Sequence, residues 1–358
     1  MDKIDLKSMQ PEELEAYLVS LGEPKFRAKQ IFSWLQKGVK DFDEMRNLPQ
    51  ALREKLGTAC YVNCLTLLQK QVSRLDGTTK YLWALRDGNA VETVVMRYDY
   101  GLSVCISTQV GCRQGCAFCA STIGGLIRNL TPSEMLDEVL YSQIDQGESI
   151  SHIVLMGIGE PLDNYDNVLR FLRLVNHPEG LNIGMRHIAL STCGLTEQID
   201  RLAEENLQIT LALSLHAPDD ETRSRLMPAN RGRGVGNVVD ACKRYFKRTG
   251  RRVSFEYAMI DGVNDSAEQA RQLAALARSA QAHVNLIPLN HVEERQFAPS
   301  TKENLCAFCG VLDRKGVNYT VRRSLGGDVD ASCGQLRRKR ERGAAAGNED
   351  NSAQAEKA

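Results

Sequence analysis

The most informative segment of the sequence is Val104-Cys105-Ile106-Ser107-Thr108-Gln109-Val110-Gly111-Cys112-Arg113-Gln114-Gly115-Cys116-Ala117-Phe118-Cys119. It begins as an apolar, strand-like run and continues into a loop in which two glycines stand among three cysteines. Apolar runs recur at 104–107, 153–156, 188–191, 209–214, 253–258, 284–288 and 319–321. Helical patterns alternate with them at 132–143, 195–204, 236–248, 266–280 and 302–315. This alternation predicts an α/β fold of about six βα units, as a partial barrel or an open doubly wound sheet.

The rest of the chain flanks this core, which we place at 103–336. Residues 1–57 carry helical patterns and predict an N-terminal accessory domain. Residues 58–102 are β-rich, with Asp-Gly pairs that favour hairpins, and predict a short connector sheet. Residues 337–358 begin with a basic run and continue in Ala, Gly, Asn and Glu, which indicates a disordered tail.

The composition narrows the class of protein. The 358 residues include 45 basic and 45 acidic side chains, so any polyanion must bind at local patches. The chain shows no export signal and no apolar run of membrane-spanning length. Eleven cysteines without an export signal indicate reduced thiols with metal or catalytic roles. We therefore expect a cytoplasmic protein.

The cysteine spacing is Cys112-x3-Cys116-x2-Cys119. Three thiolates can hold three irons of a four-iron cluster and leave the fourth iron open to a ligand, whereas electron-storage clusters take four cysteines. Zinc is the competing interpretation, but it needs a fourth ligand close by, and no His or Cys follows closely enough. The spacing therefore favours a catalytic iron–sulfur cluster.

This spacing, with Phe118 before the last cysteine, resembles the signature of the radical S-adenosylmethionine superfamily. The resemblance implies a 4Fe–4S cluster on Cys112, Cys116 and Cys119 that cleaves S-adenosylmethionine to a 5′-deoxyadenosyl radical. Further motifs are Val104 to Cys112, Gly157-Ile158-Gly159-Glu160-Pro161-Leu162, Ser214-Leu215-His216 and Cys333-Gly334-Gln335-Leu336. Together they are similar to the bacterial dual-specificity RNA methyltransferases that modify carbon-2 of adenine. This family resemblance implies a partial (β/α)6 radical-SAM barrel.

The resemblance also implies catalytic residues. Carbon-2 of adenine is electron-poor and has no lone pair to attack a methyl sulfonium, so covalent catalysis by the protein is expected. Cys333 matches the methyl-carrying thiol, Cys105 the thiol that attacks the sulfur of Cys333 and releases the product, and Glu92 the proton acceptor. Two S-adenosylmethionine molecules per turnover and an electron donor such as flavodoxin are implied. Without this context, Cys105 would be an ordinary core residue.

Positions that bind the cosubstrate are implied near the carboxyl ends of strands, where barrel enzymes build their sites. They are Gly159, Glu160, Ser191, Ser214, Leu215, His216 and Asn290. A carboxylate at Glu160 suits the methionine ammonium as a charge-assisted partner. Leu162 stands where a dinucleotide fingerprint needs its third glycine, which argues against a Rossmann motif. For Ser191 and Asn290, turn capping is the alternative.

Basic residues gather between 222 and 252, where only one acid, Asp240, accompanies them. They are Arg223, Arg225, Arg231, Arg233, Lys243, Arg244, Lys247, Arg248, Arg251 and Arg252. This imbalance predicts a surface that faces RNA phosphates, with a solvated helix face as the alternative. The N-terminal lysines and arginines and the basic run of the tail extend the predicted surface.

Three functions stay open at this point. The resemblance implies a monomer that acts on 23S ribosomal RNA and on transfer RNA, at the adenosine next to the anticodon. A carbon-8 methyltransferase of the antibiotic-resistance type would share the cluster, Cys105 and Cys333, although Gly159-Glu160-Pro161 favours carbon-2. A non-catalytic iron–sulfur protein that binds RNA is disfavoured by three rather than four cluster cysteines. No role is assigned to Cys60, Cys64, Cys193, Cys242, Cys306 and Cys309.

Overall fold

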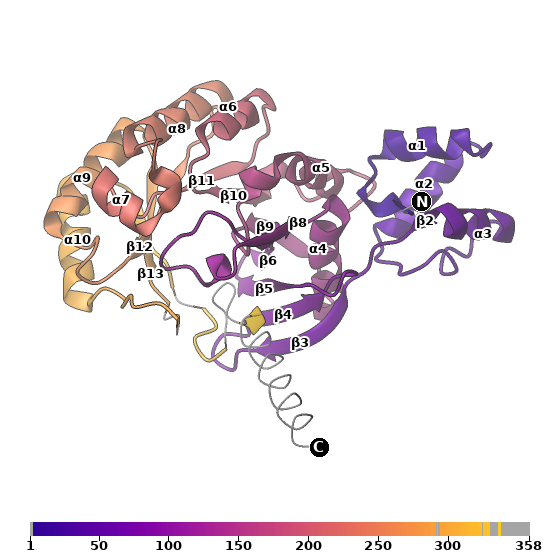
Figure 1. The fold of residues 1–358 in the computed structure, drawn as a ribbon, viewed down its shortest axis with the longest axis horizontal. Coiled ribbons are helices and arrows are strands. Elements are labelled where there is room, and N and C mark those ends of the chain that lie inside the picture. Colours follow the sequence, from indigo (N-terminus) through magenta and orange to yellow (C-terminus); the bar gives the residue numbers. More distant parts are fainter. Residues whose placement is uncertain (1–2, 291, 293, 324, 330–335, 338–358) are drawn as a thin grey trace, which may run out of the picture.

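A curved sheet of ten strands dominates the protein (Figure 1). The structure is a computed structural model that describes residues 3–290, 292, 294–323, 325–329 and 336–337. The strand order is β14-β13-β12-β11-β10-β9-β6-β5-β4-β3. The strands are β3 Thr66–Val72, β4 Thr79–Ala84, β5 Ala90–Tyr98, β6 Gly101–Cys105, β9 Ile150–Leu155, β10 Ile188–Thr192, β11 Thr210–Ser214, β12 Ser254–Met259, β13 His283–Pro288 and β14 Tyr319–Val321. Neighbours from β6 to β14 are parallel.

Helices connect the parallel strands and cover the outer side of the sheet (Figure 1). They are α4 Pro132–Gln146, α5 Tyr165–Asn176, α6 Thr196–Glu204, α7 Asp220–Leu226, α8 Val235–Thr249, α9 Ala267–Ser279 and α10 Lys302–Arg314. Strand β12 is buried along its whole length, as a strand covered on both faces should be. The predicted α/β fold with a partial barrel is confirmed.

Local sequence signals set the ends of these helices. Thr131 accepts a hydrogen bond from the N–H of Glu134, and the Glu134 carboxylate accepts one from the N–H of Thr131, so a capping box starts α4. Helix α8 ends at Gly250, whose φ of 66° lies in the left-handed region that favours glycine. The start of α4 and the end of α8 are thus set by residues within one turn of the helix end.

The β-rich segment at 58–102, predicted as a short connector sheet, contributes strands to the ten-stranded sheet. Strands β3, β4 and β5 pair antiparallel and continue the barrel sheet, because β5 pairs with β6 through Val94 and Cys105. The physical reason is that β6 would otherwise expose a row of unpaired backbone N–H and C=O groups. The hairpin strands therefore become part of the surface on which the site is built.

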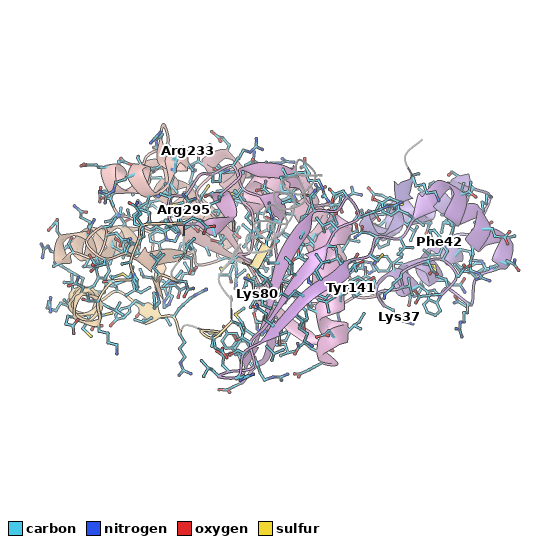
Figure 2. The ribbon with its side chains drawn as sticks, turned by 60° about the horizontal axis from the view of Figure 1, so that its bottom comes forward. Lys37, Phe42, Lys80, Tyr141, Arg233 and Arg295 are labelled. Carbon is cyan, nitrogen blue, oxygen red and sulfur yellow. The ribbon has the colours of Figure 1, made fainter. Side chains whose placement is uncertain are left out.

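The N-terminal unit has its own core and lies beside the barrel (Figure 1). It contains β1 Ile4–Asp5, α1 Pro11–Ser20, α2 Phe26–Leu35, α3 Gln50–Ala59 and β2 Cys60–Tyr61. Lys7 attaches it to α4, because its Nζ lies 2.7 Å from Asp137 Oδ1 and both side chains are buried. Figure 2 shows Lys37 and Phe42 on this unit and Tyr141 on the adjoining side of the barrel.

Two further sequence predictions concern the ends of the fold. Within the described ranges, no helix is both long enough and apolar enough to cross a membrane. The predicted disordered tail, 337–358, lies outside the described residues except for Arg337.

Candidate active site

The three-cysteine loop is closed at its base by a short hairpin. Strands β7 Gln109–Gly111 and β8 Leu126–Asn129 pair antiparallel on either side of it. Gly111 has a φ of 78°, and a Cβ on it would lie 2.0 Å from the carbonyl oxygen of Gly125. Only glycine fits this crossing. The N–H of Cys112 then donates to the same carbonyl at 3.0 Å.

The three thiols influence one another electrostatically. Burial is the main cause that raises the pKa of Cys112 to about 12; a backbone hydrogen bond at Gln114 opposes the shift, and the neighbouring Cys119 adds to it. The pKa of Cys116 is raised first by burial and then by Cys119 and Cys112. Three thiolates in this position therefore need a cationic centre. Three cysteine thiolates are the donor set that a four-iron cluster with one open iron takes.

Contacts from later elements seat this loop on the barrel. The N–H of Ala117 donates to the carbonyl oxygen of Leu226 in α7 at 2.8 Å. The Phe118 ring meets the His216 ring edge to face, with centroids 5.0 Å apart. Arg295 donates to the carbonyl oxygen of Cys119 at 3.0 Å and to Thr122 Oγ1 at 2.9 Å. Sequence reasoning missed Arg295, because nothing in its local sequence points to a loop so far away along the chain.

The predicted cosubstrate positions lie at the carboxyl ends of neighbouring strands. Ser191 Oγ and Ser214 Oγ are 3.0 Å apart, across β10 and β11. A Cβ on Gly159 would lie 2.8 Å from the backbone N of Gln109, so glycine is required there too. Asn290 is exposed two residues beyond β13. Most of the predicted positions therefore lie around one end of the barrel.

Glu160 is buried, and backbone groups already engage it. Its Oε1 accepts from the N–H of Leu162 at 3.1 Å, and its Oε2 accepts from the N–H of Cys193 at 2.8 Å. Burial raises the pKa of this carboxyl, and the hydrogen bonds oppose the shift. Each carboxylate oxygen has a second lone pair, so Glu160 can still accept a hydrogen bond from an ammonium group.

His216 is held neutral and in one tautomer. Its Nδ1 accepts a hydrogen bond from the N–H of Ala258 at 3.0 Å, so the proton belongs on Nε2. Burial, with the positive charge of Arg223 as a second cause, lowers the pKa of His216 to about 3. Its φ of 54° lies in the left-handed region and is maintained by Asn264, which donates to its carbonyl oxygen at 2.7 Å.

Glu92 and Cys105 project from the same face of the sheet. Val94, two residues after Glu92 on β5, pairs with Cys105 of β6. Because side chains two apart on a strand share a face, Glu92 lies on the face of Val94 and Cys105. Lys80 of β4 lies on this face as well, and its Nζ is 2.8 Å from Glu92 Oε2. Sequence reasoning did not single out Lys80.

The chain near its carboxyl end reaches this face. The backbone N–H of Arg337 donates to Glu92 Oε1 at 2.6 Å. Cys333, the predicted methyl carrier, lies outside the described residues.

The remaining cysteines divide between core and surface. Cys193 and Cys242 are buried in the main core, and Cys60 is buried against the Tyr17 hydroxyl, 3.0 Å away. Cys64 and Cys309 are half-buried, and Cys306 is exposed on α10. Within the described ranges, no two cysteines form a disulfide with each other.

The residues of the predicted basic surface fall into ion-paired, buried and exposed cations. Three cations on α8 pair with acids, in Lys243–Asp240, Arg244–Asp200 and Arg248–Glu204. Arg223 is fully buried, so the prediction that it faces phosphate is wrong. Arg225 and Arg231 are exposed and form no ion pair within the described part of the chain. Arg231 follows Pro228, whose ring lies 3.5 Å from the position of a Cβ on Gly115 in the cysteine loop.

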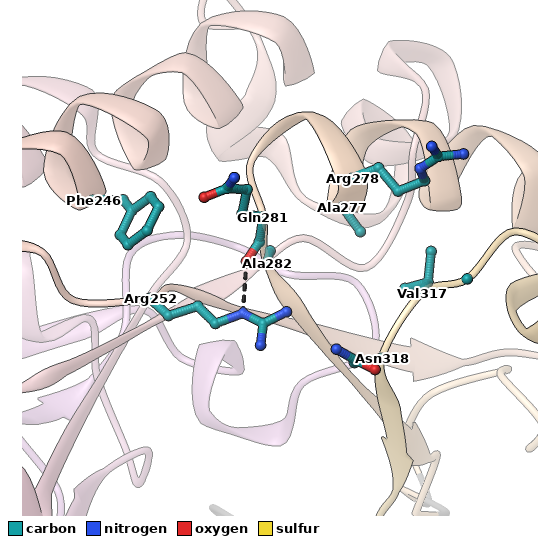
Figure 3. A pocket seen from close by; sticks show the side chains of 9 residues that line it. Phe246, Arg252, Ala277, Arg278, Gln281, Ala282, Val317 and Asn318 are labelled. Atoms are coloured by element: carbon teal, nitrogen blue, oxygen red, sulfur yellow. Dashed lines mark hydrogen bonds between the residues drawn. The ribbon is translucent and has the colours of Figure 1, made fainter.

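The pocket in Figure 3 lies elsewhere. It has a volume of about 460 Å³ and is lined by residues that include Arg252, Gln281 and Val317. Arg252 Nε donates to the carbonyl oxygen of Gln281 at 2.6 Å. These residues precede β12, β13 and β14, at the amino ends of the strands, whereas sites in such folds form at the carboxyl ends.

Family matches agree with this geometry. Residues 106–274 match the Radical SAM superfamily. Residues 4–62 match the ribosomal RNA large subunit methyltransferase N-terminal domain. The barrel and its three-cysteine loop therefore define a radical S-adenosylmethionine enzyme, a class whose cluster binds S-adenosylmethionine.

Relatives that align with most of this chain identify its family within the radical S-adenosylmethionine enzymes. A probable dual-specificity RNA methyltransferase RlmN of Lachnoclostridium phytofermentans is 52% identical over 338 residues, 94% of this chain and 95% of the relative. One of Symbiobacterium thermophilum is 54% identical over 341 residues, 94% and 92% of the two chains. The crystal structure of a radical SAM methyltransferase from Sphaerobacter thermophilus matches with a TM-score of 0.88 and 44% identity, over 93% of this chain and 98% of that one. The chain belongs to the RlmN family of dual-specificity RNA methyltransferases, which confirms the resemblance seen in its motifs.

Proposed function

We propose that this chain methylates carbon-2 of an adenine in 23S ribosomal RNA and in transfer RNA through a methyl group carried on Cys333. The observation that carries the proposal is that Glu92 and Cys105 share one face of the sheet, with Arg337 hydrogen-bonded to Glu92. Cys333 precedes Arg337 by four residues, and four residues span at most about 14 Å. Connectivity along the chain therefore supports a role for Cys333 at this face of the sheet.

The cofactor-binding roles follow from the same arrangement. Cys112, Cys116 and Cys119 would hold a 4Fe–4S cluster, which supplies the electron that cleaves S-adenosylmethionine to a 5′-deoxyadenosyl radical. Gly159 and Glu160 bind the methionine ammonium of the cosubstrate, for which Glu160 has free lone pairs. Contacts to the rest of the cosubstrate come from Ser191, Ser214, Leu215, His216 and Asn290. The electron comes from a donor such as flavodoxin, and each turnover uses two cosubstrate molecules.

The protein's own groups then carry the transfer. The Cys333 thiolate takes a methyl group from one S-adenosylmethionine, and that carbon later becomes bonded to carbon-2 of adenine. Glu92 accepts the proton that carbon-2 loses, because its carboxylate is held at the sheet face by Lys80. The Cys105 thiolate attacks the sulfur of Cys333 and breaks the bond from that sulfur to the RNA methylene carbon. This carbon keeps the electron pair and takes a proton to become the methyl group, so the modified RNA leaves as a Cys105–Cys333 disulfide forms.

Mass spectrometry of the purified protein tests this sequence of steps. Peptides that contain Cys333 should carry a methyl group in the wild type, and Cys105→Ala should retain a covalently bound nucleotide there. Cys306→Ala is the matched control, because it removes an exposed thiol on α10. If cluster-loaded protein cleaves S-adenosylmethionine but never modifies Cys333, the carrier role is refuted.

Mapping the methyl group on the RNA product tests the position of attack. Digestion to nucleosides, followed by mass spectrometry and NMR, should identify 2-methyladenosine. A methyl group on carbon-8 would instead establish the alternative activity, which shares the same cluster and thiols.

A further inference from the structure

Arg223 carries a positive charge into the interior of the barrel. Its side chain is fully buried, at 0% exposure. Nε donates to the carbonyl oxygen of Leu215 at 3.0 Å, and Nη2 donates to those of Cys193 at 2.6 Å and Ser214 at 3.1 Å. Nη1 donates to Asn230 Oδ1 at 2.6 Å. All four acceptors are neutral, so the hydrogen bonds are satisfied while the charge is not neutralised.

No carboxylate of the described residues lies within ion-pair distance of this guanidinium. Two carboxylates bind residues that Arg223 contacts, but not Arg223 itself. Asp220 accepts from Asn230 Nδ2 at 3.0 Å, and Glu160 accepts from the N–H of Cys193 at 2.8 Å. Because an arginine does not lose its proton in a protein, a buried guanidinium without a direct anion is costly. A negative charge close to the guanidinium would offset this cost.

The cysteine loop is the neighbouring element that can supply this charge. Leu226, on the same helix as Arg223, binds the N–H of Ala117, between Cys116 and Cys119. Arg223 lies one turn before Leu226 on α7, and α7 is therefore the element that carries the guanidinium against the cysteine loop. Thiolates and a bound cluster in this loop would place negative charge next to that helix.

We propose that Arg223 is the internal counter-charge of the iron–sulfur cluster and that it favours the reduced cluster. The reduction adds one electron from the external donor and makes the cluster more negative by one charge, with no bond broken and no proton moved. A fixed positive charge in a poorly screened interior stabilises the reduced form more than the oxidised form. The inference rests on the cluster of the proposed function and is independent of the RNA chemistry.

An anaerobic redox titration of the reconstituted full chain, without RNA, tests this role. Reduced cluster is measured by electron paramagnetic resonance in wild type, Arg223→Met and Arg223→Lys. Both variants lose the forked hydrogen bonds, but only Arg223→Lys keeps the charge. We expect the ratio of reduced to oxidised cluster at a fixed potential to fall about tenfold in Arg223→Met, a midpoint lower by about 59 mV. Arg223→Lys should stay within about twofold of wild type, on the same scale.

A second variant leaves Arg223 in place. Asn230→Asp keeps the shape of the side chain and puts a carboxylate in contact with Nη1, so it should lower the ratio in the same direction as Arg223→Met. The proposal is overturned if Arg223→Met and Arg223→Lys shift equally, or if Asn230→Asp with full iron content titrates like wild type. A wild-type chain that binds no cluster would instead contradict the proposed function, so the two failures are distinguishable.

Discussion

Lys80 Nζ lies 2.8 Å from Glu92 Oε2, and the two side chains are 0% and 3% exposed. Both come from antiparallel strands of the hairpin segment, and their face of the sheet also carries Cys105. The site thus combines strands from the segment before the barrel with the barrel itself.

Replacing Lys80 by Met should destabilise the fold. The substitution leaves a buried carboxylate without its ammonium partner, and breaking such a pair costs about 3–5 kcal/mol. Urea denaturation at neutral pH measures the change. The control is Arg97→Ala, which breaks an exposed pair with Glu148 and should cost below about 1 kcal/mol. If both variants lose the same free energy of unfolding, the buried pair does not stabilise the fold more than the exposed pair does.

Glu92→Gln should separate radical generation from product formation. The amide oxygen can still accept from the N–H of Arg337, but the group cannot take a proton at neutral pH. We expect RNA methylation to fall by about 10²–10⁴-fold, the usual contribution of a general base, while S-adenosylmethionine is still cleaved. Single-turnover assays that follow both products measure this, with exposed Glu148→Gln as the control. Unchanged methylation would remove Glu92 from the mechanism.

Gly111→Ala should abolish cluster loading, whereas Gly115→Ala should not. Both glycines have positive φ, at 78° and 70°. Only at Gly111 would the new Cβ collide with backbone, 2.0 Å from the carbonyl oxygen of Gly125, while at Gly115 the nearest atom is 3.5 Å away. Iron and sulfide content after reconstitution tests the difference. Full loading of Gly111→Ala would show that the loop can shift without losing its ligand geometry.

Glu138→Gln should change how stability depends on pH. Glu138 is fully buried, and its Oε2 accepts from the N–H of Ser107 and from Thr93 Oγ1. Burial raises its pKa in the folded protein well above the ordinary value. At a pH between the pKa of the unfolded chain and that of the folded protein, the folded state therefore holds a proton that the unfolded state has lost. Stability from this group is therefore present at low pH and decreases as pH rises.

The Gln variant has no such proton, so its stability relative to wild type should increase with pH. The expected slope is about 1.4 kcal/mol per pH unit, starting above the pKa of the unfolded glutamate. Urea denaturation at pH 5.5 and at pH 8 compares the two proteins. A difference that is the same at both pH values would mean that Glu138 is ionised in the folded protein.

Arg231→Ala should weaken RNA binding, whereas Arg244→Ala should not. Arg231 is exposed three residues after Pro228, which lies near Gly115 of the cysteine loop, while Arg244 is already paired with Asp200 at 2.7 Å. Losing one phosphate contact should lower the slope of log affinity against log salt by about 1. Binding to an RNA stem-loop across a salt series measures this slope. If Arg244→Ala has the larger effect, the phosphate surface runs along α8 instead.

Local sequence patterns were sufficient to predict the fold class, the cysteine loop and the family. Cys112, Cys116 and Cys119 lie within eight residues of chain, so covalent connectivity alone brings their thiols together. The start of α4 was equally readable, because the partners in its capping box are three residues apart. Features of this kind depend on spacing along the backbone, which the sequence states directly.

Which charged side chains are buried, and what they contact, depends on packing between segments that are far apart in the chain. The sequence groups Arg223 with nine other cations on a predicted surface, whereas its buried place follows from the carbonyl groups of Cys193, just after β10, and Ser214, at the end of β11. Arg295 contacts the cysteine loop from 176 residues away, and Lys80 meets Glu92 only because β4 pairs with β5. A side chain's charge is written in the sequence, but its solvation and its partners are set by long-range packing, which brings together residues that no local pattern relates.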